Sequence, residues 1–439
     1  MYRYNLFGTP AISRGFHRTK KSKWILIGSI SLNAALWFVI KELSWVLGTL
    51  SRGLSFAGIS FTAPKLRFLV PVGISYFILQ AIGYLVDVYR EKTEPERSFG
   101  KYLLFLSWFP AIVQGPISRY NQLMPSLLNG KPFAFETMRD NLLLIAIGLV
   151  KKMVIADRLG IFVNACFDGY QDLRGVILYV AAVGYAFQLY TDFSGCVDIC
   201  RGVSGLFGVE LVHNFNRPYL SRSIKEFWGK WHMSLSGWLK DYVYIPLGGN
   251  RRGTLRKYAN LLITFLISGL WHGAGFHFLF WGALHAMYQI FGQHTLSVRQ
   301  WIKQRIGIVE NSLSDWIYQR LITFHLTTFA WIFFRCKGLA SGIQYVRNML
   351  SQADLHKLFD GTLYTFGVSQ NYFSLLILNL WVLLLTEYRT ERQEDVIAGI
   401  TRQHLLIRWA VYLVLIFEVL LFGVYGSGYN MSSFMYGGF

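Results

Sequence analysis

The sequence predicts an all-α protein that crosses a membrane several times. Hydrophobic residues make up 53% of its 439 residues and charged residues only 15%, against about 25% in an ordinary soluble domain. The mean hydropathy is +0.34, and long apolar runs recur along the chain. Because so few charged side chains cannot cover a large soluble surface, we expect a polytopic membrane protein.

The order of the elements follows from these apolar runs. Residues 1–23 are polar and basic, and we expect a cytoplasmic tail there, ahead of a single membrane domain over residues 24–439. The runs lie at Trp24–Ile40 and at about 43–63, 68–89, 101–118, 140–155, 175–191, 193–212, 258–271, 275–293, 317–334, 371–387 and 405–425. Several are shorter than the roughly 20 residues that a spanning helix needs, and short broken segments are typical of re-entrant pieces covered by protein. We therefore expect about nine to eleven spans with additional re-entrant or interfacial helices.

The charge balance agrees with a membrane location. Lys and Arg outnumber Asp and Glu by 43 to 24, which gives a net charge of +19. Basic residues cluster between apolar runs, for example at Arg251, Arg252, Arg256 and Lys257. Such clusters match the Lys/Arg excess of cytoplasmic loops and attract anionic lipid headgroups. No basic stripe outside the apolar runs is interleaved with stacking aromatics, so nucleic-acid binding is not expected.

The four cysteines indicate neither a disulfide framework nor a metal centre. No pair of them has CxxC spacing. They are Cys166, Cys196, Cys200 and Cys336. We expect buried free thiols and no bound metal.

One candidate catalytic residue lies in SGLWHGAGFHFLFWGALH, residues 268–285. His272 ends an apolar run and directly precedes Gly273 and Gly275, which permit close approach by a substrate or a neighbouring helix. An ionisable residue at membrane depth is costly and indicates a functional site. A histidine titrates near neutrality, which suits a general base acting on a hydroxyl. The alternative is a histidine hydrogen-bonded between helices.

Two further histidines in this segment raise the question of a metal cluster. At about 100° per residue, His277 and His285 fall about 140° and 220° around a helix from His272. They would not share its face, so a metal site built from the three is not expected. The neighbouring glycines single out His272.

A second candidate region is SIKEFWGKWHMSLSGWLKDYVYIPLGGNRRG, residues 223–253. Its apolar residues recur at helical spacing, at Trp228, Trp231, Leu235 and Trp238. Lys225, His232 and Ser236 lie on another face, so we expect one amphipathic helix at the membrane interface, where Trp is favoured. A simple interfacial anchor would show the same pattern.

The stretch PLGGNRRG that follows is rich in turn residues and basic. We expect Asn250 and Arg251 to help hold an anionic donor such as a phosphate-bearing thioester. A positively charged cytoplasmic loop would have the same composition.

A third feature is YTDFSGCVDICRGVSGLFG, residues 190–208, in which charged residues interrupt an apolar stretch. Asp198 and Arg201 are three apart and could pair on one helix face. Asp192 would then be available to orient another group, such as an imidazole. The chain has no GxSxG elbow, P-loop, HExxH or dinucleotide fingerprint, so any chemistry would rest on histidine acting as a base.

At these residues the sequence resembles the membrane-bound O-acyltransferase family. It is most similar to the branch of alginate O-acetyltransferase membrane subunits and related bacterial polysaccharide acetylation proteins. The motifs that carry the resemblance are PVGISYFILQAIGYLVDVYR (71–90), FPAIVQGPISRY (109–120), YTDFSGCVDIC (190–200), residues 214–253, residues 268–285 and the C-terminal FMYGGF. The resemblance runs from about residue 65 to the end and is most specific over residues 214–285.

The resemblance implies a funnel-shaped membrane fold whose thin centre lets a cytoplasmic acyl donor meet an extracytoplasmic acceptor. It implies that His272 is the catalytic base and that His232 is a second functional histidine beside the same channel. We further expect Asp192, Trp271 and Ser236 to contact the substrate or the donor.

The expected reaction is transfer of an acetyl or other short acyl group from a cytoplasmic thioester, acetyl-CoA, for O-acetylation of a cell-surface polysaccharide. No cofactor would be bound. The expected partners are the donor, membrane lipid, the polysaccharide and an extracytoplasmic protein that receives the acyl group first. The expected location is the bacterial cytoplasmic membrane. Two alternatives are a teichoic-acid D-alanyl transfer protein, whose donor is a carrier-protein thioester, and a transporter or channel without bond chemistry.

Overall fold

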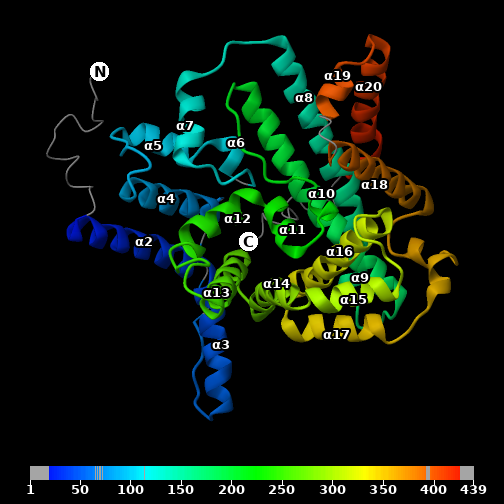
Figure 1. The fold of residues 1–439 in the computed structure, drawn as a ribbon, viewed down its shortest axis with the longest axis horizontal. Helices are drawn as coiled ribbons and strands as arrows, with labels where there is room; N and C mark the ends of the chain where they lie inside the picture. Colours follow the sequence, from blue (N-terminus) through cyan, green and yellow to red (C-terminus); the bar gives the residue numbers. More distant parts are fainter. Residues whose placement is uncertain are drawn as a thin grey trace.

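A computed structural model describes residues 19–425 apart from 65, 67, 69, 70, 72, 113 and 392–395, and all regular secondary structure in these residues is helical (Figure 1). This confirms the predicted all-α class. Most of the basic tail and the FMYGGF motif lie outside the described residues.

The helices are, in order, α2 (Lys20–Lys41), α3 (Leu43–Phe56), α4 (Ile74–Tyr89), α5 (Phe99–Leu106), α6 (Phe109–Ile112), α7 (Tyr120–Asn129), α8 (Phe135–Leu149), η1 (Val150–Ala156), α9 (Asp157–Asp168), α10 (Val176–Leu206), η2 (Pro218–Leu220), α11 (Ile224–Lys230), α12 (Met233–Leu239), η3 (Lys240–Tyr244), α13 (Thr254–His272), α14 (Phe276–His294), α15 (Leu296–Arg305), α16 (Leu313–Arg335), α17 (Leu339–Leu350), η4 (Leu355–Leu358), η5 (Thr362–Thr365), α18 (Gln370–Glu391), α19 (Val396–Thr401) and α20 (Leu405–Phe422).

Among the described residues, four helices are long and apolar enough to cross a membrane: α2, α10, α18 and α20. The sequence predicted about nine to eleven spans; the remaining apolar runs form shorter or more polar helices, such as the 16-residue α4. The apolar parts of α2 and α20 bury no residue inside the protein, whereas 78% of the apolar part of α10 is buried. Helices α2 and α20 therefore expose their apolar side chains to lipid, and α10 lies at the centre of the protein.

Residues 176–206 form one helix where we expected two. The predicted interruption at Asp192 is absent, because this residue lies inside the 31-residue helix α10. The carboxylate of Asp192 is paired with Lys152 on η1. Side chains of α10 such as Tyr185 and Phe193 belong to the main hydrophobic cluster, which also includes residues of α9, α11, α14, α16 and α17. The helices that carry the candidate histidines pack around this core.

Helices α13 and α14 form an antiparallel hairpin whose backbones approach closely. A Cβ added to Gly269 would lie 2.4 Å from the backbone oxygen of Phe278, and one added to Gly282 would lie 2.3 Å from the backbone oxygen of Phe265. No side chain fits at either contact, since real Cβ atoms keep more than 3.0 Å from such atoms. Glycine is therefore required at both positions for the hairpin to close.

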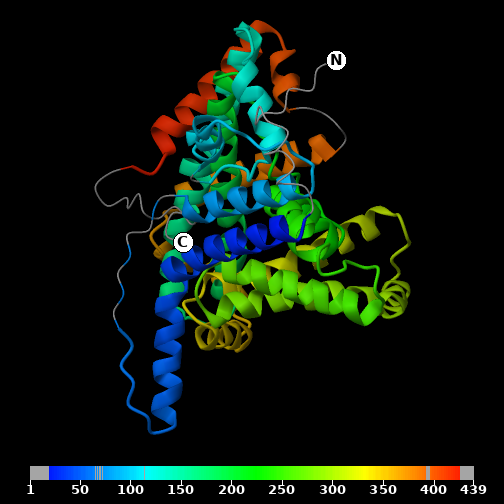
Figure 2. The same cartoon turned by 90° about the vertical axis from the view of Figure 1, so that its left-hand side faces the viewer.

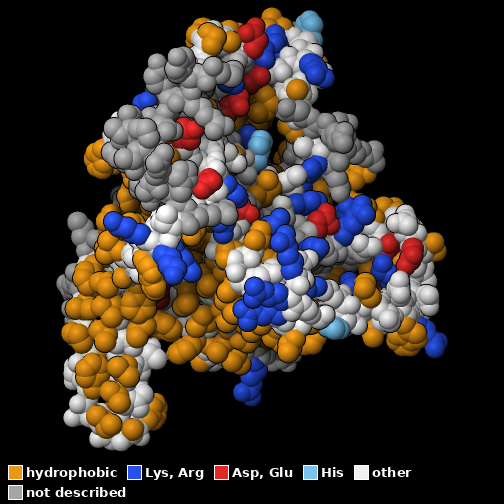
Figure 3. All heavy atoms as spheres, turned by 60° about the vertical axis from the view of Figure 1, so that its left-hand side comes forward, with side chains coloured by type: hydrophobic (Ala, Val, Ile, Leu, Met, Phe, Trp, Pro, Cys, Tyr) orange, Lys and Arg blue, Asp and Glu red, His pale blue; other side chains and the backbone are white. Residues whose placement is uncertain are grey.

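The surface carries the apolar area that a membrane protein needs. Figure 3 shows hydrophobic side chains gathered over the lower half of one face, with Lys and Arg side chains mostly above them. In Figure 2, α3 projects away from the body of the molecule, and none of its residues is buried. Trp24, Trp381 and Trp409 are exposed on α2, α18 and α20. Apolar exposure of this extent marks a surface in contact with lipid.

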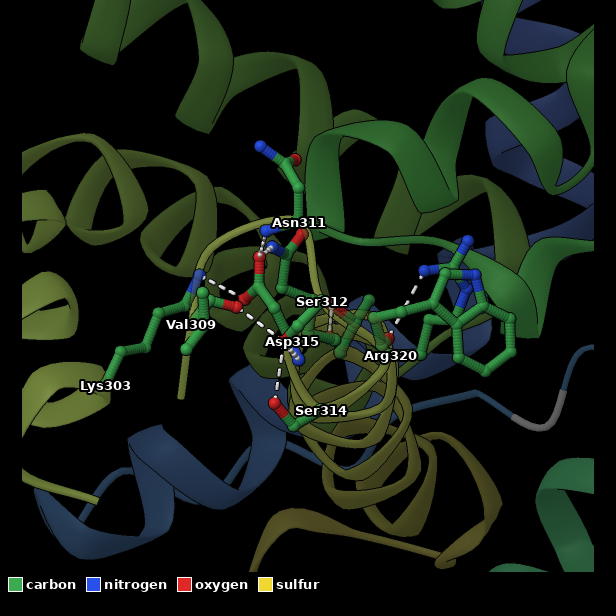
Figure 4. Close-up of polar contacts among 10 residues, drawn as sticks. Lys303, Val309, Asn311, Ser312, Ser314, Asp315 and Arg320 are labelled. Atoms are coloured by element: carbon green, nitrogen blue, oxygen red, sulfur yellow. Dashed lines mark hydrogen bonds and ion pairs between the residues drawn. The ribbon is translucent and has the colours of Figure 1, made fainter. Parts of the chain in front are cut away.

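The polar connection that leads into α16 is ordered around Asp315 (Figure 4). Lys303 of α15 lies 2.5 Å from one carboxylate oxygen. The other oxygen accepts hydrogen bonds from Gln319 at 2.8 Å and from the backbone N–H of Asn311 at 3.1 Å. Ser312 caps the helix by accepting the backbone N–H of Asp315. The bonds from Lys303 and Gln319 lower the pKa of Asp315 to about 2.

Candidate active site

His272 is the last residue of α13, and aromatic rings enclose it. It is 3% exposed, and its ring centroid lies 4.9 Å from Trp271, 5.1 Å from Trp281 and 5.3 Å from Phe334. Its Nδ1 lies 2.9 Å from the backbone oxygen of Ser268. Because a carbonyl oxygen can only accept, Nδ1 carries the proton of the neutral ring and Nε2 carries the lone pair. In this tautomer Nε2 is the nitrogen that can accept a proton, as a general base must.

The glycines after His272 make room for other side chains of the protein. Gly273 and Gly275 have φ angles of 167° and 160°, an extended backbone that any residue adopts. A Cβ on Gly273 would lie 2.5 Å from the ring of Phe278, and one on Gly275 would lie 2.4 Å from the ring of His277. The expected close approach is present, and rings of α14 make it.

His232 lies between two short helices, so the expected continuous amphipathic helix is wrong. It separates α11 from α12 with a left-handed backbone, φ 43° and ψ 54°. Trp231 and Leu235 are each 1% exposed and Trp238 is 6% exposed. The apolar stripe therefore packs inside the protein and is not an interfacial anchor. His232 itself is also 1% exposed.

Asn214, which the sequence analysis missed, holds this break in place. Its backbone oxygen accepts the N–H of Met233 at 2.9 Å, and its side-chain Oδ1 accepts the N–H of Ser234 at 3.1 Å. Ser234 Oγ in turn accepts the N–H of Ile117 at 3.0 Å. These bonds satisfy donors that the start of α12 would leave open and fix the backbone next to His232. A capping residue so far along the chain from its helix leaves no sequence signal.

Trp271 connects the two candidate histidines. Its ring centroid lies 6.0 Å from that of His232 and 4.9 Å from that of His272, and Tyr76 packs against it at 5.7 Å. Trp271 Nε1, both ring nitrogens of His232 and the hydroxyl of Tyr76 are buried without a hydrogen-bond partner among the described residues. Because buried polar groups are nearly always paired, these atoms are the candidates for hydrogen bonds to a polar ligand.

Asp192, which the sequence suggested as a residue that orients an imidazole, is paired with a lysine. Lys152 Nζ lies 2.5 Å from Asp192 Oδ1 and 2.7 Å from Asp157 Oδ1, and all three side chains are buried. The expected pair of Asp198 with Arg201 is present at 3.7 Å. The structure therefore gives Asp192 a structural partner.

The remaining predicted residues lie elsewhere. Ser236 is half-buried and donates to a backbone oxygen of the preceding turn at 3.3 Å. Asn250 and Arg251 are exposed, in a turn where Gly248 and Gly249 have φ angles of 110° and 57°. Of the predicted set, the structure thus brings Trp271 together with the two histidines and leaves the basic turn at the surface.

A third buried histidine, His285, lies near this group. Its ring centroid is 5.2 Å from that of Trp281, and Trp281 in turn lies 5.1 Å from His272. We placed His285 and His272 on different faces of one continuous helix. That expectation is wrong, because α13 ends at His272 and α14 begins at Phe276. The two closely spaced glycines after His272 are the sequence signal for the break.

The four cysteines are free, with Cys200 half-buried and the other three buried. Within the part of the chain that the structure describes, no group of three or more His, Cys, Asp or Glu side chains is placed to hold a metal ion.

An all-helical body with an apolar surface is that of a polytopic membrane protein, and its buried histidines form the candidate site. Comparison with known families gives the class. Residues 25–338 match the model of MBOAT, the membrane-bound O-acyltransferase family, and the chain belongs to this family.

Individual relatives are similar over much of the chain. The probable alginate O-acetylase AlgI of Pseudomonas putida is 33% identical over 340 residues, 77% of this chain and 67% of the relative. The peptidoglycan O-acetyltransferase of Helicobacter pylori is 36% identical and matches 65% of this chain and 58% of the relative. The teichoic acid D-alanyltransferase of Bacillus subtilis is 28% identical over 61% of this chain and 69% of the relative. The chain thus spans between 58% and 69% of the length of these three relatives.

Proposed function

We propose that this protein is a membrane O-acyltransferase that transfers an acetyl group from acetyl-CoA for O-acetylation of a cell-surface polysaccharide. The observation that carries the proposal is His272, whose Nδ1 is bound to the carbonyl of Ser268 so that Nε2 holds the lone pair. Family membership supports acyl transfer, and relatives at 33–37% identity named as O-acetylases or O-acetyltransferases favour acetyl over D-alanyl.

In the proposed reaction, Nε2 of His272 removes the proton of the acceptor hydroxyl as its oxygen attacks the thioester carbonyl. A C–O bond forms, and the carbonyl oxygen becomes an oxyanion. The oxyanion then collapses, the C–S bond breaks, and the thiolate takes the proton from His272. Protons and charges balance, so the chemistry requires no oxidant or reductant. His232, which also packs against Trp271, orients the acceptor or relays the proton.

The donor, partners and location belong to the same proposal. The exposed basic turn with Asn250 and Arg251 is suited to the phosphate groups of CoA. The acceptor side would involve an extracytoplasmic protein that passes the acetyl group to the polysaccharide. The membrane would be the bacterial cytoplasmic membrane, where acetyl-CoA is available on one side.

Replacing His272 tests the proposal. We expect His272→Ala to abolish acetyl esters on the surface polysaccharide of a complemented deletion strain, with the protein still inserted in the membrane. His294→Ala is the matched control, because this histidine is exposed at the end of α14. Acetyl esters at the level of the unmutated protein in His272→Ala would refute the proposal. Loss of D-alanyl esters in place of acetyl esters would assign the alternative donor.

A further inference from the structure

His285 and Trp281 carry two buried N–H groups, and Trp281 packs against the ring of His272. Both residues are 0% exposed. Trp281 Nε1 and His285 Nε2 have no hydrogen-bond partner among the described residues. The two rings pack edge to face at 5.2 Å, and Trp281 also contacts the ring of His272 at 5.1 Å. The pair is therefore a wall of the site that the mechanism above does not use.

The tautomer of His285 follows from its one hydrogen bond. Nε1 of Trp228 lies 3.2 Å from Nδ1 of His285. An indole N–H can only donate, so Nδ1 accepts and the proton of the neutral ring is on Nε2. His285 therefore has the opposite tautomer to His272, whose Nε2 carries the lone pair. One imidazole offers a base and the other offers a donor.

The surroundings make an unpaired donor costly unless a ligand pairs with it. The ring of His285 is enclosed by Trp228 at 5.0 Å, Tyr288 at 5.9 Å and Phe265 at 6.1 Å. A buried donor without a partner costs about 1–3 kcal/mol. Two such donors favour an oxygen that carries negative charge, and surroundings that exclude water strengthen that interaction.

We propose that the Nε2–H of His285 and the Nε1–H of Trp281 bind the carbonyl oxygen of the acyl thioester and stabilise the oxyanion formed beside His272. This inference rests on the proposed acyl transfer. As the hydroxyl attacks, the carbonyl electron pair moves onto this oxygen, and the two N–H groups donate to it. The pair then releases the oxygen when the carbonyl re-forms and the thiolate leaves.

Two replacements of His285 separate this role from a structural one. In His285→Asn, the amide oxygen can take the place of Nδ1 and keep the bond from Trp228, but the Nε2 donor is lost. In His285→Gln, the amide nitrogen can take the place of Nε2 and the acceptor for Trp228 is lost. If His285 acts as a donor, His285→Gln must be the more active variant. If it only holds Trp228, His285→Asn must be the more active variant.

The assay uses the full chain in lipid nanodiscs with labelled acetyl-CoA and, as acceptors, uronic acid oligosaccharides and peptidoglycan fragments. Removing one oxyanion donor typically lowers kcat about 10²- to 10³-fold. We expect that loss in His285→Asn and in Trp281→Phe, with KM for acetyl-CoA changed much less and the thermal unfolding midpoint retained. We expect His285→Gln to be at least about tenfold more active than His285→Asn.

The outcomes distinguish the two proposals. Suppose that the unmutated protein turns over and that His272→Ala does not. An unchanged kcat in His285→Asn or in Trp281→Phe would then overturn the donor pair alone. Higher activity in His285→Asn than in His285→Gln would also overturn it. Absence of acetyl transfer by the unmutated protein to any acceptor would overturn the proposed function, and the donor pair with it.

Discussion

The contact between α13 and α14 predicts a large effect from adding one methyl group. In Gly282→Ala, the new Cβ would lie 2.3 Å from the backbone oxygen of Phe265, so the helices must separate by roughly 1 Å to reach ordinary van der Waals contact. This neighbour is a backbone atom, so it has no rotamer into which it can move. Overpacking of this kind costs about 1–3 kcal/mol, and the better helix propensity of alanine returns at most about 1 kcal/mol.

Gly292→Ala on the same helix is the matched control, because a Cβ there meets no atom within 4 Å. Gly292→Ala gains the higher helix propensity of alanine without a clash, so it should stabilise the protein slightly. Both variants would be purified in detergent and compared by thermal unfolding and by CoA release. We expect a lower unfolding midpoint and at least a tenfold loss of activity only in Gly282→Ala, because separating the helices moves His272 away from Trp281 and misplacement by 1 Å can cost about 10²-fold. Equal behaviour of the two variants would refute the reasoning.

Two further predictions concern charged groups. Lys152→Met should lower the free energy of unfolding by about 3–5 kcal/mol, because it leaves the carboxylates of Asp157 and Asp192 buried without their cation. Denaturation of the double variant Lys152→Met/Asp192→Asn should show that part of this free energy is recovered. No recovery would contradict the ion-pair explanation. The lowered pKa of Asp315, about 2 against about 3.9 in the unfolded chain, means that its stabilising bond to Lys303 is fully present above pH 4 and is lost as the pH falls through 2. Limited proteolysis before α16 should therefore increase between pH 4 and pH 2 in the native protein but stay constant over that range in Asp315→Asn, and a parallel increase in both would refute the assignment.

The sequence predicted those features that depend on local composition. The apolar run Trp24–Ile40 became α2, and the pair of Asp198 with Arg201 formed as its spacing indicated. The position of Trp271 beside both histidines agrees with its choice as a site residue.

Features that depend on distant contacts were not predictable in this way. The break at His232 is set by bonds from Asn214, and the continuity of α10 through Asp192 is set by Lys152 on another helix. Helical periodicity carries no information about either partner. The position of His285 was mispredicted for a related reason. A helical wheel that continues through residue 273 ignores the reversal of the chain between α13 and α14.

The left-handed backbone at residue 232 restricts which amino acids can replace the histidine. Apart from glycine, the residues that adopt this conformation most readily are asparagine, aspartate and histidine. Alanine would add backbone strain of about 1–2 kcal/mol to the loss of the imidazole, and a β-branched residue would add more. Asparagine is the replacement that keeps both the turn and a neutral polar side chain, so His232→Asn measures the imidazole alone, and evolutionary exchange at this position should be confined to the same small set.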